Sequence, residues 1–239
     1  MPVVDIHPHI VSPDIKRYPL APLGGTQSTW SSERPTTYEM LLKEMNAVGV
    51  DKAAIVHSST AYGYDNSYVA DAVATVPSRF TGVYSIDVLA SDAVKTFDYW
   101  LARGCGGMRL FTTGSTLRDQ STWFADPMTY PFWEHAAAKS IPVCMHFALA
   151  KYEQVYLKVT PINISPKSWG NGAPGTFFRK VIDTFGATRI GWGSNFPNSV
   201  GTLSEILGAA RKAFSFARES EQDWVFGKTA QVLYPCLAK

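Results

Sequence analysis

The sequence predicts an α/β fold in which crossover helices cover a parallel sheet. Short apolar runs, each long enough for one strand, alternate with longer segments whose apolar residues recur at helical spacing. The chain has 239 residues, of which 46% are hydrophobic and 18% are charged. This length and composition allow a substantial buried core and exclude an intrinsically disordered chain. No repeat or linker interrupts the alternation, so we expect a single domain over residues 1–239.

In the first half of the chain, strands and helices are predicted in strict alternation. The predicted strands cover residues 3–9, 52–58, 80–87 and 107–111. A loop rich in Pro, Gly and Ser over residues 12–35 is long enough to cover a functional site. One helix is expected between a cap at Thr36 or Thr37 and a stop at Gly49, a second over residues 66–74, and a third between a cap at Ser91 and a stop at Gly104.

The second half begins with an irregular stretch to residue 128 and then returns to the alternation. Only residues 148–154 separate the fifth predicted strand from the sixth, whereas a parallel crossover needs about a dozen residues. A loop is expected over residues 161–174. The predicted strands are 141–147, 155–160 and 189–192, and the predicted helices are 131–139, 176–185, 203–216 and 223–234.

Charge and cysteine content narrow the class of protein. Lys and Arg number 22 against 20 Asp and Glu, and no segment concentrates basic residues, so we expect neither nucleic acid nor a membrane surface as a partner. No apolar run approaches the roughly 20 residues that span a bilayer. The amino terminus lacks the pattern of a signal peptide. With three scattered cysteines, Cys105, Cys144 and Cys236, a reduced cytoplasmic protein is expected.

The strongest local feature is the segment Asp5-Ile6-His7-Pro8-His9 at the end of the first predicted strand. Alternate residues of a strand share one face, so Asp5, His7 and His9 are expected to point the same way. Two imidazoles side by side are natural ligands for a divalent metal, and a neighbouring carboxylate can bind or orient them. The alternative is a pair of partly exposed histidines at a strand end.

Six segments, in order along the chain, resemble motifs of the amidohydrolase superfamily, in its amidohydrolase-related (amidohydrolase 2) branch. The resemblance implies a TIM-barrel-like (β/α)8 fold with the chemistry at the carboxyl ends of the strands, where His7, His9, His146 and Asn195 would converge. Among its members, the opening segment is most similar to that of pyrone dicarboxylate lactonases. The matching segments are residues 5–9, 106–110 (Gly-Gly-Met-Arg-Leu), 142–146 (Pro-Val-Cys-Met-His), 155–159 (Val-Tyr-Leu-Lys-Val), 189–197 (Arg-Ile-Gly-Trp-Gly-Ser-Asn-Phe-Pro) and 227–230 (Gly-Lys-Thr-Ala).

The resemblance also implies roles for the histidines. His7, His9 and His146 would hold a divalent metal, zinc or manganese, and His146 would stabilise a developing oxyanion. Lactonases of this branch work without a metal, so a metal-free mechanism stays open. Lys158 matches a lysine of the family, with an ion pair inside the barrel as the alternative.

Two departures from the family pattern affect the mechanism. Most catalytic members carry an aspartate at the position of Asn195, and an amide cannot act as a general base. The base would then be Asp5, His146 or a metal that lowers the pKa of its bound water. The short junction after the fifth strand predicts a barrel shortened by about one βα unit. Its open strand edges would need covering, for example by a homo-oligomer.

Four further residues are candidates for substrate binding. Arg109 at a strand end and Arg118 in the following loop could hold a carboxylate through bidentate hydrogen bonds, with a structural ion pair or a solvated charge as the alternative. His57 ends the second strand and could bind substrate or lie satisfied near the core. Tyr62 belongs to a group of loop aromatics suited to a flat cyclic substrate, with ordinary loop packing as the alternative.

The leading hypothesis is therefore a hydrolase that opens a lactone or related cyclic ester of a small carboxylic acid. A metal-dependent decarboxylase of an unsaturated or aromatic acid is the first alternative. A barrel that binds a small molecule without catalysis is the second, motivated by Asn195 and the shortened middle.

Overall fold

The computed structural model describes residues 2–110, 126–144, 153–165 and 174–238. The chain divides into two compact units, each with its own strands and helices. The first unit contains Met1–His9, Glu39–Ala54 and Ala148–Lys239, and the second contains Ile10–Tyr38 and Ile55–Phe147. His146 and Arg118, both predicted site residues, lie outside the described residues, as does the short junction after the fifth predicted strand.

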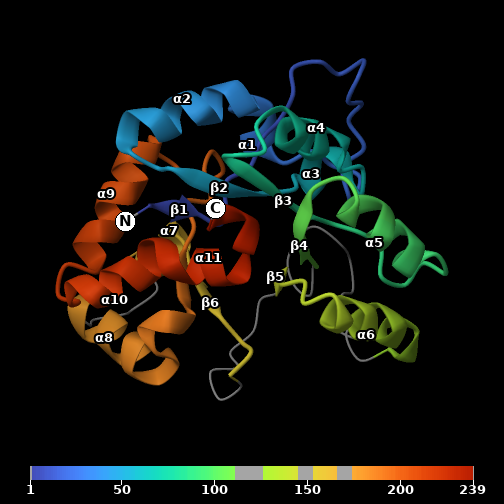
Figure 1. The fold of residues 1–239 in the computed structure, drawn as a ribbon. Helices are drawn as coiled ribbons and strands as arrows, with labels where there is room; N and C mark the ends of the chain where they lie inside the picture. Colours follow the sequence, from blue (N-terminus) through green and yellow to red (C-terminus); the bar gives the residue numbers. More distant parts are fainter. Residues whose placement is uncertain (1, 111–125, 145–152, 166–173, 239) are drawn as a thin grey trace. The chain divides into compact units, whose positions relative to one another are not determined.

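Parallel strand pairs form the centre of the first unit (Figure 1). Strand β1 (Val4–Asp5) pairs with the start of β2 (Lys52–Val56), and β6 (Leu157–Val159) pairs with β7 (Ile190–Trp192). Beyond β1 the chain follows β7, since Ile6 N–H donates to the Trp192 carbonyl at 3.2 Å. The carboxyl ends of β1 and β7 are thereby held together.

Helices surround these strands in the first unit. Val4, Ile190, Trp192, Leu203 and Phe214 have no exposed surface and form its core. The carboxyl-terminal helices are continuous through a π-helical turn, Trp224–Lys228, that contacts β7. The helices are α2 (Tyr38–Val48), α7 (Pro161–Ile164), α8 (Pro174–Phe185), α9 (Leu203–Ala213), α10 (Glu219–Asp223) and α11 (Thr229–Leu233).

The second unit is built on parallel strands with buried side chains. Strand β3 (Phe80–Tyr84) is buried throughout, as expected for a parallel strand covered on both faces. It pairs with β4 (Cys105–Arg109), which pairs in turn with β5 (Val143–Cys144). The His57 N–H donates to the Val83 carbonyl at 2.8 Å and so ties the end of β2 to β3.

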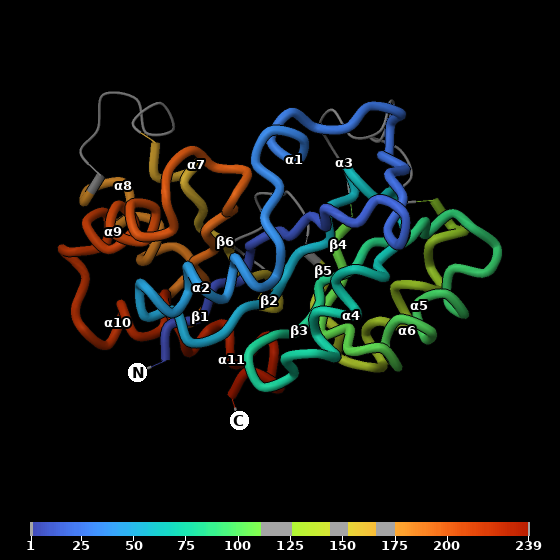
Figure 2. The backbone as a smooth tube through the Cα atoms, turned by 90° about the horizontal axis from the view of Figure 1, so that it is seen from above, coloured from blue at the N-terminus to red at the C-terminus, as the bar shows by residue number. Residues whose placement is uncertain are grey.

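In the described part of the second unit, five α-helices accompany these strands. Helices α5 and α6 lie side by side in both views (Figures 1 and 2), where the ring of Phe97 meets that of Phe132 at a centroid distance of 5.4 Å. The helices are α1 (Thr29–Glu33), α3 (Ser59–Tyr62), α4 (Ser67–Thr75), α5 (Ala93–Leu101) and α6 (Tyr130–Ala138).

Several element boundaries differ from the prediction. The first strand is Val4–Asp5 rather than residues 3–9, because the chain leaves the β2 ladder after Asp5 and bonds first to Trp192 of β7 and then to Phe196 beyond it. The helix predicted to be capped by Ser91 begins at Ala93. The last helical region begins at Glu219, four residues before its prediction, because residues 219–222 are polar and carry no apolar periodicity. No helix among the described residues is long and apolar enough to cross a membrane.

Candidate active site

Asp5 is the buried centre of the polar cluster in the first unit. Its side chain has no exposed surface, and its Oδ1 accepts from the backbone N–H of His7 at 2.9 Å and of Ser194 at 2.8 Å. Its Oδ2 is buried without a hydrogen-bond partner in the described part of the chain. Burial raises the pKa of Asp5 to about 6, against the opposing effect of hydrogen bonds from Ser194 and His7. A carboxyl with this pKa can exchange a proton near neutral pH.

His7 lies between His9 and a lysine. The His7 and His9 rings meet edge to face, with centroids 4.9 Å apart, and both side chains are almost fully buried. The Lys158 ammonium contacts Nδ1 of His7. An ammonium has only hydrogens to donate, so Nδ1 of a neutral His7 accepts and its proton resides on Nε2. His7 can then donate a hydrogen bond from Nε2, supported by a positive charge on the other side of the ring.

The pairing of β6 with β7 brings Lys158 to this position. Lys158 lies opposite Gly191 in the ladder, and the Gly193 N–H donates to the Val159 carbonyl at 2.9 Å. A Cβ atom at Gly193 would lie 2.6 Å from Cβ of His7, so only glycine allows this approach of the two segments.

Asn195, which follows β7, is held in an unusual backbone conformation. Its φ is 52°, in the left-handed region that Asn tolerates better than most residues. Its Nδ2 donates to Ser199 Oγ at 3.1 Å, and its Oδ1 accepts from Asn198 Nδ2 at 3.3 Å. The amide therefore organises its own loop and has no basic lone pair to offer a water molecule.

The predicted divalent metal needs several His, Cys, Asp or Glu side chains around one point. Nδ1 of His7 is taken by Lys158, and Asp5 uses Oδ1 to bind backbone N–H groups. No group of three or more His, Cys, Asp or Glu side chains in the described ranges is arranged to hold a metal ion. The third predicted ligand, His146, is not among the described residues, so the metal site stays a prediction.

The second unit holds a different polar cluster, around His57. His57 has no exposed surface, and its Nε2 lies 2.9 Å from the Gly63 carbonyl oxygen. Burial lowers the pKa of His57 to about 4, and the charge of Arg109 acts in the same direction. His57 is thus neutral at physiological pH.

Tyr62, predicted to bind substrate, has a structural partner. Its hydroxyl oxygen accepts from the Ser12 N–H at 2.7 Å, and its ring centroid lies 6.3 Å from that of His57. Ser85 and Ser194 were not singled out by sequence reasoning, and their position within two residues of the end of a strand is the signal that could have found them. Ser194 bonds Asp5, whereas the hydroxyls of Ser59 and Ser85 are buried and have no partner in the described part of the chain.

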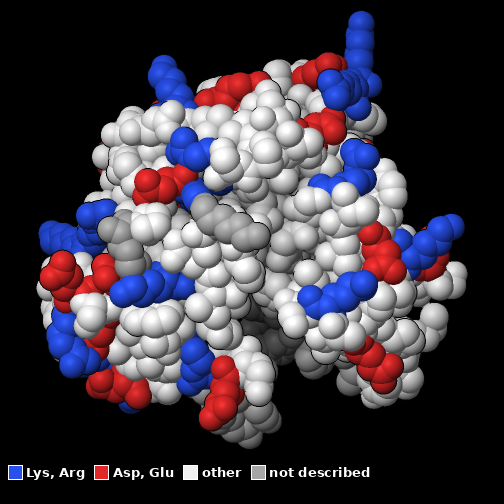
Figure 3. Space-filling model, viewed as in Figure 1, with Lys and Arg blue, Asp and Glu red and all other residues white. Residues whose placement is uncertain are grey.

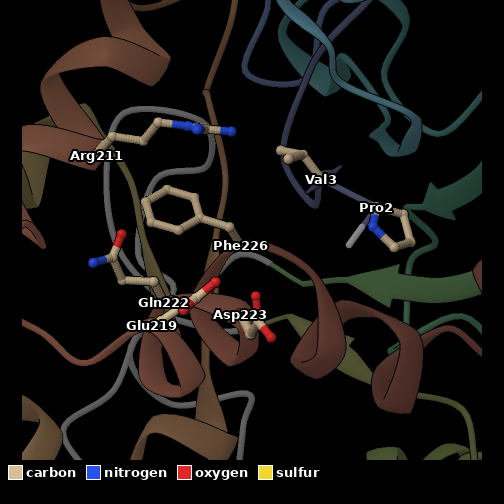
Figure 4. A pocket seen from close by; sticks show the side chains of 7 residues that line it. All are labelled: Pro2, Val3, Arg211, Glu219, Gln222, Asp223 and Phe226. Carbon is tan, nitrogen blue, oxygen red and sulfur yellow. The ribbon is translucent and has the colours of Figure 1, made fainter.

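The described residues also form a cavity and a mixed-charge surface outside these clusters. A cavity of about 260 Å³ in the first unit lies beside the amino end of β1 (Figure 4). Arg211, Glu219 and Asp223 line this cavity, and Lys228 forms an ion pair with Asp223. The Arg211 guanidinium lies 5.9 Å from the Phe226 ring centroid. Basic and acidic side chains are interspersed on the face seen in Figure 3, consistent with the net charge of +2.

The sequence matches the Amidohydrolase family (Amidohydro_2) over residues 4–148. No curated protein sequence matches the chain. Similar solved structures include a proposed 2-pyrone-4,6-dicarboxylic acid hydrolase from Pseudomonas putida, with 17% identity, 98% of each chain covered and a TM-score of 0.76. An amidohydrolase from Burkholderia multivorans with bound zinc has 14% identity and a TM-score of 0.71, with 98% of this chain and 99% of that chain covered. A 2,6-dihydroxybenzoate decarboxylase in complex with 2,6-dihydroxybenzoate has 14% identity and a TM-score of 0.68, with the same coverage.

Proposed function

Because this chain belongs to the amidohydrolase family, we propose that it is a hydrolase that opens a lactone or related cyclic ester of a small carboxylic acid. The observation that supports this proposal most directly is the contact of the Lys158 ammonium with Nδ1 of His7, beside the buried carboxyl of Asp5. The similarity to the proposed pyrone dicarboxylic acid hydrolase supports the same substrate class. The fold similarity to amidohydrolases covers 98% of the chain.

In this proposal, the chain's own side chains carry the acyl-transfer step. Nε2–H of His7 donates to the carbonyl oxygen of the lactone, and His9 orients that ring from its edge. A water molecule attacks the carbonyl carbon and gives its proton to Asp5, whose pKa of about 6 suits a general base near neutral pH. The positive charge of Lys158, acting through His7, stabilises the negative oxygen of the tetrahedral intermediate.

Ring opening completes the reaction. The intermediate collapses, the bond between the acyl carbon and the ring oxygen breaks, and the departing oxygen takes back the proton held by Asp5. The products are a carboxylic acid and a hydroxyl group, and the acid then releases its proton to solvent, so atoms and charge balance without any co-reactant. Arg109, in the second unit, stays a predicted carboxylate-binding residue, because a guanidinium can bind a carboxylate through two parallel hydrogen bonds.

Metal binding and decarboxylase activity remain predictions separate from this mechanism. Zinc or manganese at His7, His9 and His146 would polarise the carbonyl if that site forms. The fold is shared with a 2,6-dihydroxybenzoate decarboxylase, so loss of carbon dioxide is the competing reaction.

The two reactions are distinguished by their products. Purified protein is offered 2-pyrone-4,6-dicarboxylate and, separately, 2,6-dihydroxybenzoate, while ring absorbance and released carbon dioxide are recorded. Loss of the pyrone absorbance without carbon dioxide supports the proposal. Carbon dioxide release from the benzoate without pyrone opening would reject it in favour of the decarboxylase.

A further inference from the structure

Three buried side-chain atoms near the carboxyl ends of β2 and β3 have no hydrogen-bond partner in the described part of the chain. They are Nδ1 of His57, Oγ of Ser59 and Oγ of Ser85, all in the second unit. A buried polar atom without a partner costs about 1–3 kcal/mol. Ser58, by contrast, satisfies its hydroxyl by donating to the Ile10 carbonyl at 2.9 Å. The unpaired atoms are therefore a feature of particular positions and not of the whole segment.

The bond to Gly63 determines what His57 can offer. A carbonyl oxygen only accepts, so Nε2 of His57 must carry the proton that it donates. Nδ1 of a neutral imidazole is then a lone pair, able only to accept. The low pKa of His57, about 4, keeps that lone pair available at physiological pH.

We propose that Nδ1 of His57 accepts a hydrogen bond from a hydroxyl group of the ligand, so that the second unit selects carboxylic acids that also carry a free hydroxyl. The hydroxyls of Ser59 and Ser85 are likewise buried without a partner in the described part of the chain, and a hydroxyl can either donate or accept. The inference deepens the proposed function, on which the carboxylic acid class rests.

The charges around His57 favour this ligand over others. Burial, assisted by the charge of Arg109, disfavours protonation of His57, so the ring does not become a second cation for an anion to bind. A carboxylate facing Nδ1 would place two acceptors together, which is unfavourable. A hydroxyl on a molecule whose carboxylate pairs with a guanidinium satisfies both groups. Hydroxy acids are also what lactone opening produces.

Two substitutions at His57 separate its two nitrogens. His57→Gln places an amide N–H near the position of Nε2 and can keep the bond to Gly63, but it removes the acceptor at Nδ1. His57→Asn places an amide oxygen near the position of Nδ1 and loses the bond to Gly63. A structural role for the residue predicts that His57→Gln is the milder change. The proposed role predicts that His57→Asn is the milder one for ligand selection.

The measurement is the ratio of dissociation constants for hydroxybenzoates and methoxybenzoates substituted at the same ring position, by titration calorimetry. We expect the wild type to prefer the hydroxyl roughly tenfold, His57→Asn to keep most of the preference, and His57→Gln to lose it. Equal ratios in all three proteins, or a wild type that binds neither series, would overturn the proposal. Equal ratios of dissociation constants would show that Nδ1 of His57 does not distinguish a hydroxyl from a methoxy group.

A second readout keeps the test decisive if a variant does not fold. The ¹⁵N shift of His57 Nδ1 in the wild type should change when a hydroxybenzoate binds and stay constant with the methoxy analogue. No difference between the two would also overturn the proposal. Because neither readout depends on turnover, a lactone assay on the same sample shows whether the proposed hydrolase function fails on its own.

Discussion

His7 and His57 are both buried histidines near strand ends, but their surroundings give them opposite properties. His7, in the first unit, has a lysine ammonium on Nδ1 and a buried carboxyl two residues earlier in the chain. His57, in the second unit, bonds a backbone carbonyl through Nε2 and leaves Nδ1 without a partner in the described residues. In both rings the proton resides on Nε2. The difference is at Nδ1, which contacts a cation in His7 and is a lone pair without a partner in the described residues in His57.

Both rings are buried, so the different chemical roles of the two histidines come from the groups that contact their nitrogens. A charge behind His7 strengthens the hydrogen bond that its Nε2–H donates, which suits a developing oxyanion. An unpaired acceptor at His57 suits recognition of a neutral donor. The following experiments test these different roles of His7 and His57.

Replacing His7 and His9 together by Ala should have the largest effect on turnover. Removing the donor and the ring that orients it should lower kcat/KM for a lactone by about 1000-fold. His135→Ala is the control, since His135 on α6 forms an ion pair with Asp98 on α5 at 2.8 Å and belongs to neither cluster. Unchanged turnover in a folded double variant would remove the first unit's cluster from the reaction.

Lys158→Met should lower kcat by roughly 100-fold, because it removes the cation from His7 but keeps the length of the side chain. Lys158→Arg should restore part of the loss. Lys95→Met on an exposed position of α5 is the control. Lys158 acts through His7, so the pH profile of kcat should also move. A loss of binding alone, with the same kcat and pH profile, would contradict the assigned role.

The pH dependence of stability tests the neutral state of His57. Its pKa is about 4 in the folded chain against an ordinary value of 6.5, so between these values the unfolded chain binds a proton that the folded chain does not. Stability should therefore fall as pH falls from 6.5 to 4, by about 3 kcal/mol in total. Asp65 and Arg109 are the charged groups acting on this ring.

Asp5 has the opposite effect, because its folded pKa is raised from 3.8 to about 6. Wild type and His57→Gln share the contribution of Asp5, so it cancels when the free energy of unfolding of the variant is subtracted from that of the wild type. Denaturant unfolding from pH 7 to pH 4 should show the wild type losing stability relative to the variant. Parallel curves would mean that His57 is not kept neutral by the fold.

Asn195→Asp should have the smallest effect, a rise in turnover of a few-fold. Aspartate can keep the contact with Asn198 and accept from Ser199, so the loop should retain its conformation. The new carboxylate would give the attacking water a second base. A fall in turnover with unchanged thermal stability would show that the amide already has its own role.

Much of the fold was accessible from sequence because it depends on local pattern. The apolar runs at residues 80–87 and 189–192 predicted β3 and β7, and Gly49 and Gly104 correctly marked helix ends. The first strand was predicted too long because a period of two does not reveal when a segment exchanges one neighbour for another. The polar residues 219–222 concealed the start of α10 for lack of an apolar stripe.

The site was predictable as a set of residues but not as a set of contacts. The spacing of Asp5, His7 and His9 identified the cluster, yet the contact of Lys158 with His7 joins residues 151 positions apart and depends on the β6–β7 register. The tautomer of His57 likewise depends on where the Gly63 carbonyl lies. The roles of His146 and Arg118 stay predictions.

The most direct test of the central claim is lactone turnover by protein whose metal content has been measured after exhaustive chelation. The account assigns the acyl-transfer step to the chain's own residues, with Lys158 on His7 as its key contact. It predicts that chelated, metal-free protein opens 2-pyrone-4,6-dicarboxylate at an undiminished rate and that the His7→Ala/His9→Ala variant does not. Activity that disappears with the metal and returns on adding zinc or manganese would contradict it.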